Sequence, residues 1–216
     1  MMPPYVLSVS ILLSVIFGAV FCYRPSSVTK TVIKVASTGL LALWAYLLGG
    51  PHLLVAALVF GVVGDGFMSG NLEKWLLPAM VAFFAGHLAY LALFMTTPLR
   101  PLDSVALTIA CAIFALSAGF VAFLWDSLAE MRWPVVAYTT VIALMGITAA
   151  RLDIGTPFVA IGAVMFIVSD IFVALETFKI DEEAGIRRLT SPLLWALYYG
   201  GQALIAYGIL VSAQIL

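Results

Sequence analysis

The stretch that decides the fold of this chain is residues 156–178, which read TPFVAIGAVMFIVSDIFVALETF. An apolar run of this length matches the roughly 20 residues that an α-helix needs to cross the hydrocarbon core of a bilayer. Asp170 lies inside the run, and an ionisable group at such depth costs at least a few kcal/mol. The stretch therefore predicts a transmembrane helix that carries a candidate functional group.

Further apolar runs of about this length fill the rest of the chain, and clusters of Pro, Gly and charged residues separate them. They are residues 5–23, 28–48, 52–69, 75–96, 102–124, 133–150 and 192–213. We expect an all-α membrane protein, a bundle of about eight transmembrane helices in a single polytopic domain over residues 1–216. No Lys or Arg precedes the first run, so we expect a mature helix there rather than a cleavable signal peptide.

The composition excludes a soluble fold and a nucleic-acid partner. Of the 216 residues, 64% are hydrophobic and only 10% are charged, and the mean hydropathy is +1.15. A soluble chain needs far more charge to cover its surface. The net charge of −1 shows no basic excess that could bind nucleic acid or an anionic lipid surface.

The basic residues are distributed unevenly between the two sets of loops. One set and its flanks hold Arg24, Lys30, Lys74, Arg132, Lys179, Arg187 and Arg188, whereas the other set holds only Arg100 and Arg151. By the positive-inside rule the first set is cytoplasmic. This predicts a multi-pass protein with both termini outside, located in the cell membrane if the host is bacterial.

Four ionisable residues inside the spans are candidate functional groups: Lys34, Asp65, His87 and Asp170. At about 1.5 Å per helical residue, Asp65 lies about 6 Å from the cytoplasmic helix ends, Lys34 about 9 Å, Asp170 about 12 Å and His87 about 18 Å. All four thus fall in the cytoplasmic half or near the midplane. This clustering predicts one site that faces the cytoplasmic leaflet.

Other polar side chains share this depth and extend the candidate site. By helical spacing, they are Tyr90 beside His87, Tyr138 in the sixth span, and Tyr198, Tyr199 and Gln202 in the last. Small residues next to the acids, Gly61, Gly64 and Ser169, would let neighbouring helices approach closely. We therefore expect a compact polar pocket.

Two short matches are consistent with a parallel repeat of two four-helix halves. Residues 63–65 (VGD) resemble residues 168–170 (VSD), and residues 86–87 (GH) resemble residues 201–202 (GQ). Each pair is separated by four spans that run in the same direction.

The paired acids suggest acid–base chemistry. Two carboxyl groups in a low-dielectric site cannot both ionise cheaply, so one tends to keep its proton and the other its charge. A structural ion pair between Lys34 and Asp65 is an alternative, and a proton relay in a carrier is another.

Metal and thiol chemistry find no support in the residue pattern. Only His52 and His87 are present, with His52 at the outer end, so we expect no metal site. We expect no cofactor either. Cys22 and Cys111 lie in separate apolar runs without metal or disulfide spacing, and we interpret both as packing residues.

Five motifs carry a resemblance to a known family. They are VGD at residues 63–65, FFAGHLAY at 83–90, RWP at 132–134, FIVSD at 166–170 and YYGGQ at 198–202. In order and spacing, over nearly the whole chain, they resemble the YhhN family of lysoplasmalogenases. The resemblance implies an eight-span enzyme of lipid metabolism. Its members hydrolyse the vinyl ether bond of a lysoplasmalogen, with water as co-substrate, to a fatty aldehyde and a glycerophospho head group.

The resemblance also implies roles for residues of this chain. Asp65 and Asp170 would be the catalytic acids, in either order, and Lys34 the intramembrane lysine. The remaining polar residues would orient the lysophospholipid or the water: His87, Tyr90, Tyr138, Tyr198, Tyr199 and Gln202. Two positions depart from the family pattern, Val35 where many members have Pro and Gln202 where some have His. A proton-coupled carrier or lipid-binding protein that uses the same acids stays the alternative.

Overall fold

A computed structural model describes residues 3–70 and 72–216 of the chain. Met1, Met2 and Asn71 lie outside the described residues. The described part is helical apart from its loops and one isolated bridge between Leu99 and Leu152. Its eight α-helices are α1 (Pro3–Ile16), α2 (Val28–Leu47), α3 (His52–Met68), α4 (Leu72–Met95), α5 (Ser104–Leu124), α6 (Arg132–Ala150), α7 (Phe158–Phe178) and α8 (Arg187–Ser212).

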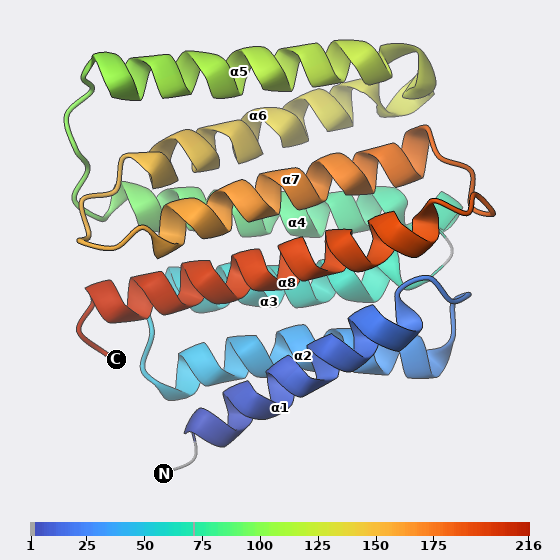
Figure 1. Ribbon diagram of the computed structural model, residues 1–216. Helices are drawn as coiled ribbons and strands as arrows, with labels where there is room; N and C mark the ends of the chain where they lie inside the picture. The colour runs from blue at the N-terminus through green and yellow to red at the C-terminus, as the bar shows by residue number, and fades with distance from the viewer. Residues whose placement is uncertain (1–2, 71) are drawn as a thin grey trace.

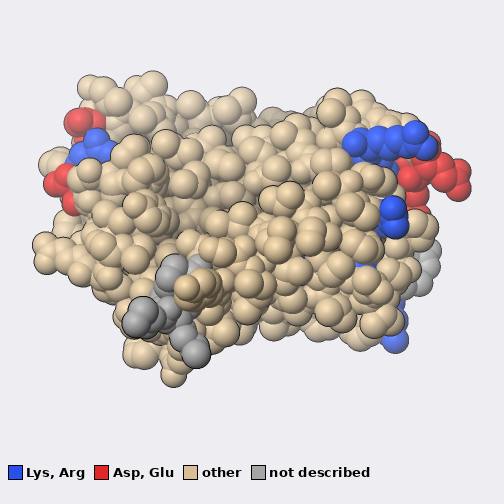
Figure 2. Space-filling view, turned by 60° about the horizontal axis from the view of Figure 1, so that its bottom comes forward, with Lys and Arg blue, Asp and Glu red and all other residues tan. Residues whose placement is uncertain are grey.

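The prediction of an all-α membrane protein is confirmed, and the described residues form eight α-helices, whereas the prediction of about eight transmembrane helices is confirmed in part. Six of the helices are long and apolar enough to cross a membrane, whereas α3 and the continuous stretch Tyr5–Phe21 are shorter. Figure 2 shows the physical consequence: on the face in view, the charged side chains gather at the two ends of the molecule, and a broad uncharged belt separates them.

The first and the last helix differ most clearly from the sequence expectation. The first helix turns into a π-helix at Phe17–Phe21 instead of staying regular to residue 23. The last helix begins at Arg187, five residues before the expected start at Pro192. Pro192 therefore lies inside the helix, where its missing N–H removes one helical hydrogen bond. Arg187 donates to the carbonyls of Ile180 and Asp181, which holds the earlier start in place.

The helices alternate in direction along the bundle, and both described ends of the chain lie at one end of it (Figure 1). The most extensive packing joins α3 to α4 and α7 to α8, and α6 packs between α4, α5 and α7. The helix α5 packs mainly against α6, and only 6% of the most apolar window in Ser104–Ser127 is buried. It is the most peripheral of the six membrane-length helices.

Glycines set the closest helix contacts, as the sequence predicted for the residues before Asp65. A Cβ on Gly64 would lie 2.7 Å from the Phe83 ring of α4, and one on Gly61 would lie 3.0 Å from the Gln202 amide of α8. Between α7 and α8, a Cβ on Gly162 would lie 2.6 Å from the carbonyl oxygen of Gly201. The parallel repeat of two halves stays a prediction.

The interpretation of Cys111 as a packing residue is wrong, because its side chain is exposed on α5. That helix turns most of its surface outward, so an apolar residue on it need not be a core residue. Cys22 is half-buried and donates from its thiol to the carbonyl of Gly18 at 3.0 Å.

Candidate functional site

A cavity of about 490 Å³ lies within the bundle, and five of the predicted site residues line it. Those five are Lys34, Asp65, Tyr138, Asp170 and Tyr198. They come from α2, α3, α6, α7 and α8, so the cavity exists only when these helices pack together. Its volume falls in the range of small-molecule sites, which is about 300–1,000 Å³.

Asp65 on α3 is held by a cation and a hydroxyl. The Lys34 ammonium lies 3.2 Å from Oδ1, and the Tyr198 hydroxyl donates to Oδ2 at 2.9 Å. Asp65 is 1% exposed and the Lys34 side chain 15% exposed, so the pair is largely removed from solvent. Both partners stabilise the charged form of the carboxylate.

Asp170 on α7 has different neighbours. The Tyr138 hydroxyl of α6 donates to its Oδ2 at 2.7 Å, and Nε2 of His87 on α4 lies 3.8 Å from the same oxygen. No Lys or Arg in the described part of the chain forms an ion pair with this carboxyl group. The two acids therefore sit in unlike electrostatic surroundings.

The hydrogen bond on the far side of His87 determines its tautomer. Its Nδ1 lies 2.6 Å from the carbonyl oxygen of Phe83. A carbonyl only accepts, so Nδ1 carries the proton and Nε2 presents a lone pair toward Asp170 in the neutral ring. Two acceptors face each other unless one is protonated. At 3.8 Å the two atoms form no hydrogen bond, and the contact favours a proton on one of the two groups over two facing lone pairs.

Phe166 on α7 connects the two acid clusters. Its ring centroid lies 4.7 Å from that of His87 and 5.4 Å from that of Tyr198, both in edge-to-face arrangements. Edge-to-face pairs at such distances stabilise a fixed packing. Phe166 thus packs Tyr198, which bonds Asp65, and His87, which lies beside Asp170, into one unit.

The other predicted site residues lie behind the cavity wall or away from it. His87, Tyr90, Tyr199 and Gln202 do not line the cavity. In the described chain, the Tyr90 hydroxyl and both amide atoms of Gln202 are buried without a hydrogen-bond partner. Tyr199 instead bonds Ser10 of α1 at 2.6 Å, which joins α8 to the first helices.

Sequence reasoning missed Glu176, which lines the same cavity at the last turn of α7. Its carboxylate accepts from the hydroxyls of Thr190 and Ser191 on α8, and the Arg187 guanidinium lies 3.6 Å away. The signal was available, because Glu176 lies inside the apolar run 156–178. Glu176 lies near the end of that run, so a search for ionisable groups deep inside the spans did not include it.

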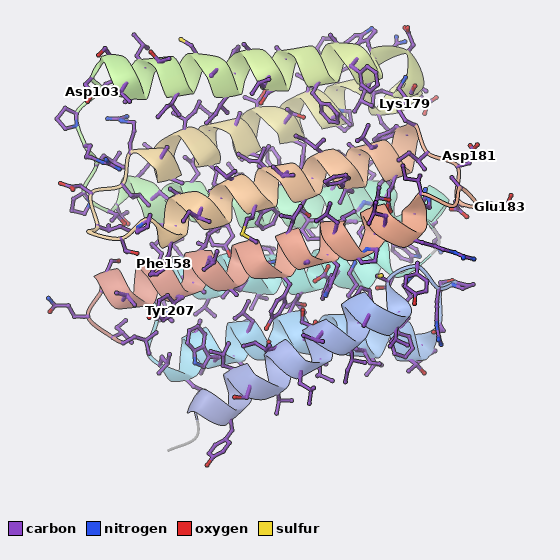
Figure 3. The ribbon with its side chains drawn as sticks, viewed as in Figure 1. Asp103, Phe158, Lys179, Asp181, Glu183 and Tyr207 are labelled. Carbon is purple, nitrogen blue, oxygen red and sulfur yellow. The ribbon has the colours of Figure 1, made fainter. Side chains whose placement is uncertain are left out.

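The Glu176 cluster ties together the two ends of the α7–α8 loop. Figure 3 labels Lys179, Asp181 and Glu183 of this loop, which project at the end of the molecule opposite to Asp103 and to the Phe158–Tyr207 contact. The cavity therefore lies toward the loops that carry most of the basic residues. In residues 3–70 and 72–216, no three His, Cys, Asp or Glu side chains gather as a metal site would require.

Comparison with known proteins agrees with the family that the motifs suggested. A model of the YhhN family matches residues 29–209. Lysoplasmalogenases of Mycobacterium bovis and Mycobacterium tuberculosis are each 26% identical over 168 residues, covering 75% of this chain and 62% of theirs.

A mammalian relative extends the likeness beyond bacteria. Lysoplasmalogenase TMEM86A of Bos taurus is 28% identical over 175 residues, covering 74% of this chain and 66% of its own. The matched part thus spans less than two thirds of each of these relatives. No solved structure matches the chain significantly.

Proposed function

Since the chain belongs to the YhhN family, we propose that it is a membrane-embedded hydrolase that cleaves the vinyl ether bond of a lysoplasmalogen. The products are a fatty aldehyde and a glycerophospho head group. The names of the relatives support this substrate class. The observation that carries the proposal is a pair of acids, the buried Asp65 and the half-buried Asp170, which line one cavity with unlike partners.

Vinyl ether hydrolysis needs a protonated acid beside an anion. We assign the acid role to Asp170, because its neighbours are a hydroxyl and a histidine lone pair rather than a cation. We assign the anion role to Asp65, because Lys34 and Tyr198 favour its charged form. The sequence left this order open, and the unlike surroundings of the two acids support one choice.

In the first step Asp170 gives its proton to the outer alkene carbon, and the ether oxygen shares the positive charge of the resulting oxocarbenium ion. Asp65 stabilises this cation electrostatically. Water then attacks the carbon attached to oxygen and gives one proton to Asp65. The product of this step is a neutral hemiacetal.

The hemiacetal then collapses and restores both acids. Asp65 returns its proton to the leaving glycerol oxygen as the carbon–oxygen bond breaks. The hemiacetal hydroxyl loses its proton to Asp170 as the aldehyde forms. One water molecule is consumed, and each aspartate ends in its starting state.

Four further residues position the acids in this proposal. Tyr138 fixes the orientation of Asp170, and His87 stabilises its protonated form through Nε2. Lys34 keeps Asp65 charged, and Tyr198 orients it. We propose that Tyr90 and Gln202, which lie behind the cavity wall, support the packing of these residues. Tyr199 links α8 to α1.

The proposed orientation places both termini outside and the cavity toward the cytoplasmic leaflet, in a single polytopic domain. The uneven loop charge supports this orientation. A lysolipid of that leaflet has its head group at the interface and its vinyl ether a few ångströms deeper. That depth is close to the expected depth of the two acids.

The test is aldehyde release by the purified protein in detergent from a vinyl-ether lysolipid, beside the matching acyl lysolipid. Aldehyde from the vinyl ether is expected, with loss of about 10²-fold or more in Asp65→Asn and in Asp170→Asn. Lack of product from a monodisperse, folded protein would reject the hydrolase. The same acids would then be tested for proton-coupled transport in vesicles.

A further inference from the structure

The cavity has two chemically different parts. Its polar part holds Lys34, Asp65 and Asp170, whereas its other part is lined mainly by apolar side chains of α5, α6 and α7. The residues from α5 are Ile113, Leu116, Ser117 and Phe120. Their spacing of three and four places them on one face of the helix, which α5 turns toward the cavity. We call this part, with Val164 and Val168 of α7, the α5–α7 groove.

The groove is open at its outer edge. Leu116 and Val164 line the cavity, yet they are 74% and 57% exposed. A side chain can do both only where the cavity meets the outside of the protein. The two residues come from helices on opposite sides of α6, so the opening lies between α5 and α7 (Figure 1). We call this opening the lateral mouth.

The lateral mouth lies at membrane depth rather than at the loops. At about 1.5 Å per residue, Leu116 lies about 12 Å from the end of α5 at Leu124, and Val164 about 21 Å from the end of α7 at Phe178. Both positions fall inside a hydrocarbon core about 30 Å thick. The mouth therefore faces lipid chains, not water.

A cavity with a charged inner part and an apolar arm that ends in lipid matches a single-chain amphiphile. The polar part can hold the reacting bond and the start of the head group, and the mainly apolar arm can hold hydrocarbon. The helix α5 has few packing partners besides α6, so little other structure closes the arm.

We propose that the hydrocarbon chain of the lysolipid lies in the α5–α7 groove and that substrate and aldehyde pass through the lateral mouth directly from and to the bilayer. The identity of the lipid rests on the proposed function, whereas the path rests on the cavity alone. Because the arm is open at its end, the enzyme tolerates long chains. Chain atoms beyond the mouth stay in the lipid and meet no wall.

The path is tested first without any catalysis. An acyl lysolipid with a photoreactive diazirine at mid-chain is bound to the wild-type protein in detergent, irradiated, and the labelled residues are mapped by mass spectrometry. Labels are expected in residues 113–120 of α5 and 164–168 of α7. Labels at the loop around residues 22–27 instead, or spread evenly over lipid-facing residues such as Phe114, would overturn the path.

A second measurement uses a larger side chain that is placed in the groove. Ser117→Trp fills the groove, and it should reduce labelling at least fivefold and raise KM for a long-chain vinyl-ether lysolipid about tenfold. The same variant should leave a two-carbon vinyl-ether analogue within about twofold, because the short chain ends before the groove. Phe114→Trp is the matched control, since Phe114 is on α5, 59% exposed and outside the cavity lining. Equal loss on both analogues would reject the groove as the chain site.

These outcomes separate the two proposals. Groove labelling by a protein that releases no aldehyde would keep the path and reject the hydrolase. Aldehyde release with labels elsewhere would keep the hydrolase and reject the path.

Discussion

The Lys34 ammonium and the Asp65 carboxylate, on neighbouring helices, form an ion pair of 3.2 Å inside the bundle. Such a pair gives little net stability, because removing both charges from water costs about as much as their attraction returns. Removing only one partner is costly, since it leaves an isolated buried charge. The pair is therefore better explained by a need for a permanent anion at Asp65 than by stability.

We expect Lys34→Met to lower both activity and stability, because Asp65 is left buried without its cation. Loss of one partner costs about 3–5 kcal/mol in fully buried pairs, and the partial exposure of Lys34 places the expected loss at the lower end. The double variant Lys34→Met with Asp65→Asn should recover the melting temperature but not aldehyde release. Recovery of activity in the double variant would show that Asp65 has no chemical role.

Tyr138→Phe should lower kcat without loss of folded protein, because it removes the 2.7 Å hydrogen bond to Asp170. Asp170 becomes an anion as it gives up its proton, and a hydrogen bond to a charged group is worth about 1.5–3 kcal/mol, which corresponds to about 10- to 100-fold in rate. Steady-state aldehyde release provides the measurement. Tyr23→Phe is the control, as the Tyr23 hydroxyl bonds only locally to the carbonyl of Ala19. Unchanged kcat would remove Tyr138 from the positioning of the acid.

Gly201→Ala should destabilise the protein by about 1–3 kcal/mol through overpacking of α7 against α8. A Cβ there would lie 2.8 Å from the carbonyl oxygen of Gly162, and backbone cannot move aside as a side chain can. Gly119→Ala on α5 has nothing within 4 Å and should change stability by less than about 0.5 kcal/mol. Thermal unfolding in detergent compares the two. Equal melting temperatures would contradict the close approach of these helices.

Glu176→Ala should loosen the α7–α8 loop, because Arg187, Thr190 and Ser191 lose their shared acceptor. Limited trypsin digestion measures this, with faster cleavage expected after Lys179 and Arg187. Glu183→Ala serves as the control, since Glu183 lies exposed in the same loop. A digestion rate equal to that of the control would show that the cluster does not hold the loop.

Much of the fold could be predicted because hydropathy is a local property. Each apolar run of about 20 residues has one stable solution in a bilayer, a helix that satisfies its own backbone. The structure differs from the predicted helix ends at Arg187, where loop contacts shift the boundary, and at Phe17, where a π-helical turn begins. These depend on neighbours that a local pattern does not contain.

The packing of the helices against each other could not be predicted from hydropathy. Most spans are apolar on every side, so no polar stripe marks the outward face. Cys111 was misinterpreted for this reason, because apolar surroundings in sequence do not distinguish a lipid-facing residue from a buried one. For the same reason nothing in the sequence singled out the α5–α7 groove.

By itself, the sequence determined that this protein is a multi-helix membrane protein with a few ionisable groups at similar depth, because the cost of charge in lipid makes each group stand out. Only the tertiary structure decided that Lys34 and Tyr198 hold Asp65, and that Tyr138 and His87 surround Asp170. These contacts join residues far apart in the chain, and they depend on helix rotation and crossing. In a bilayer both are set by close side-chain packing, which hydropathy does not encode.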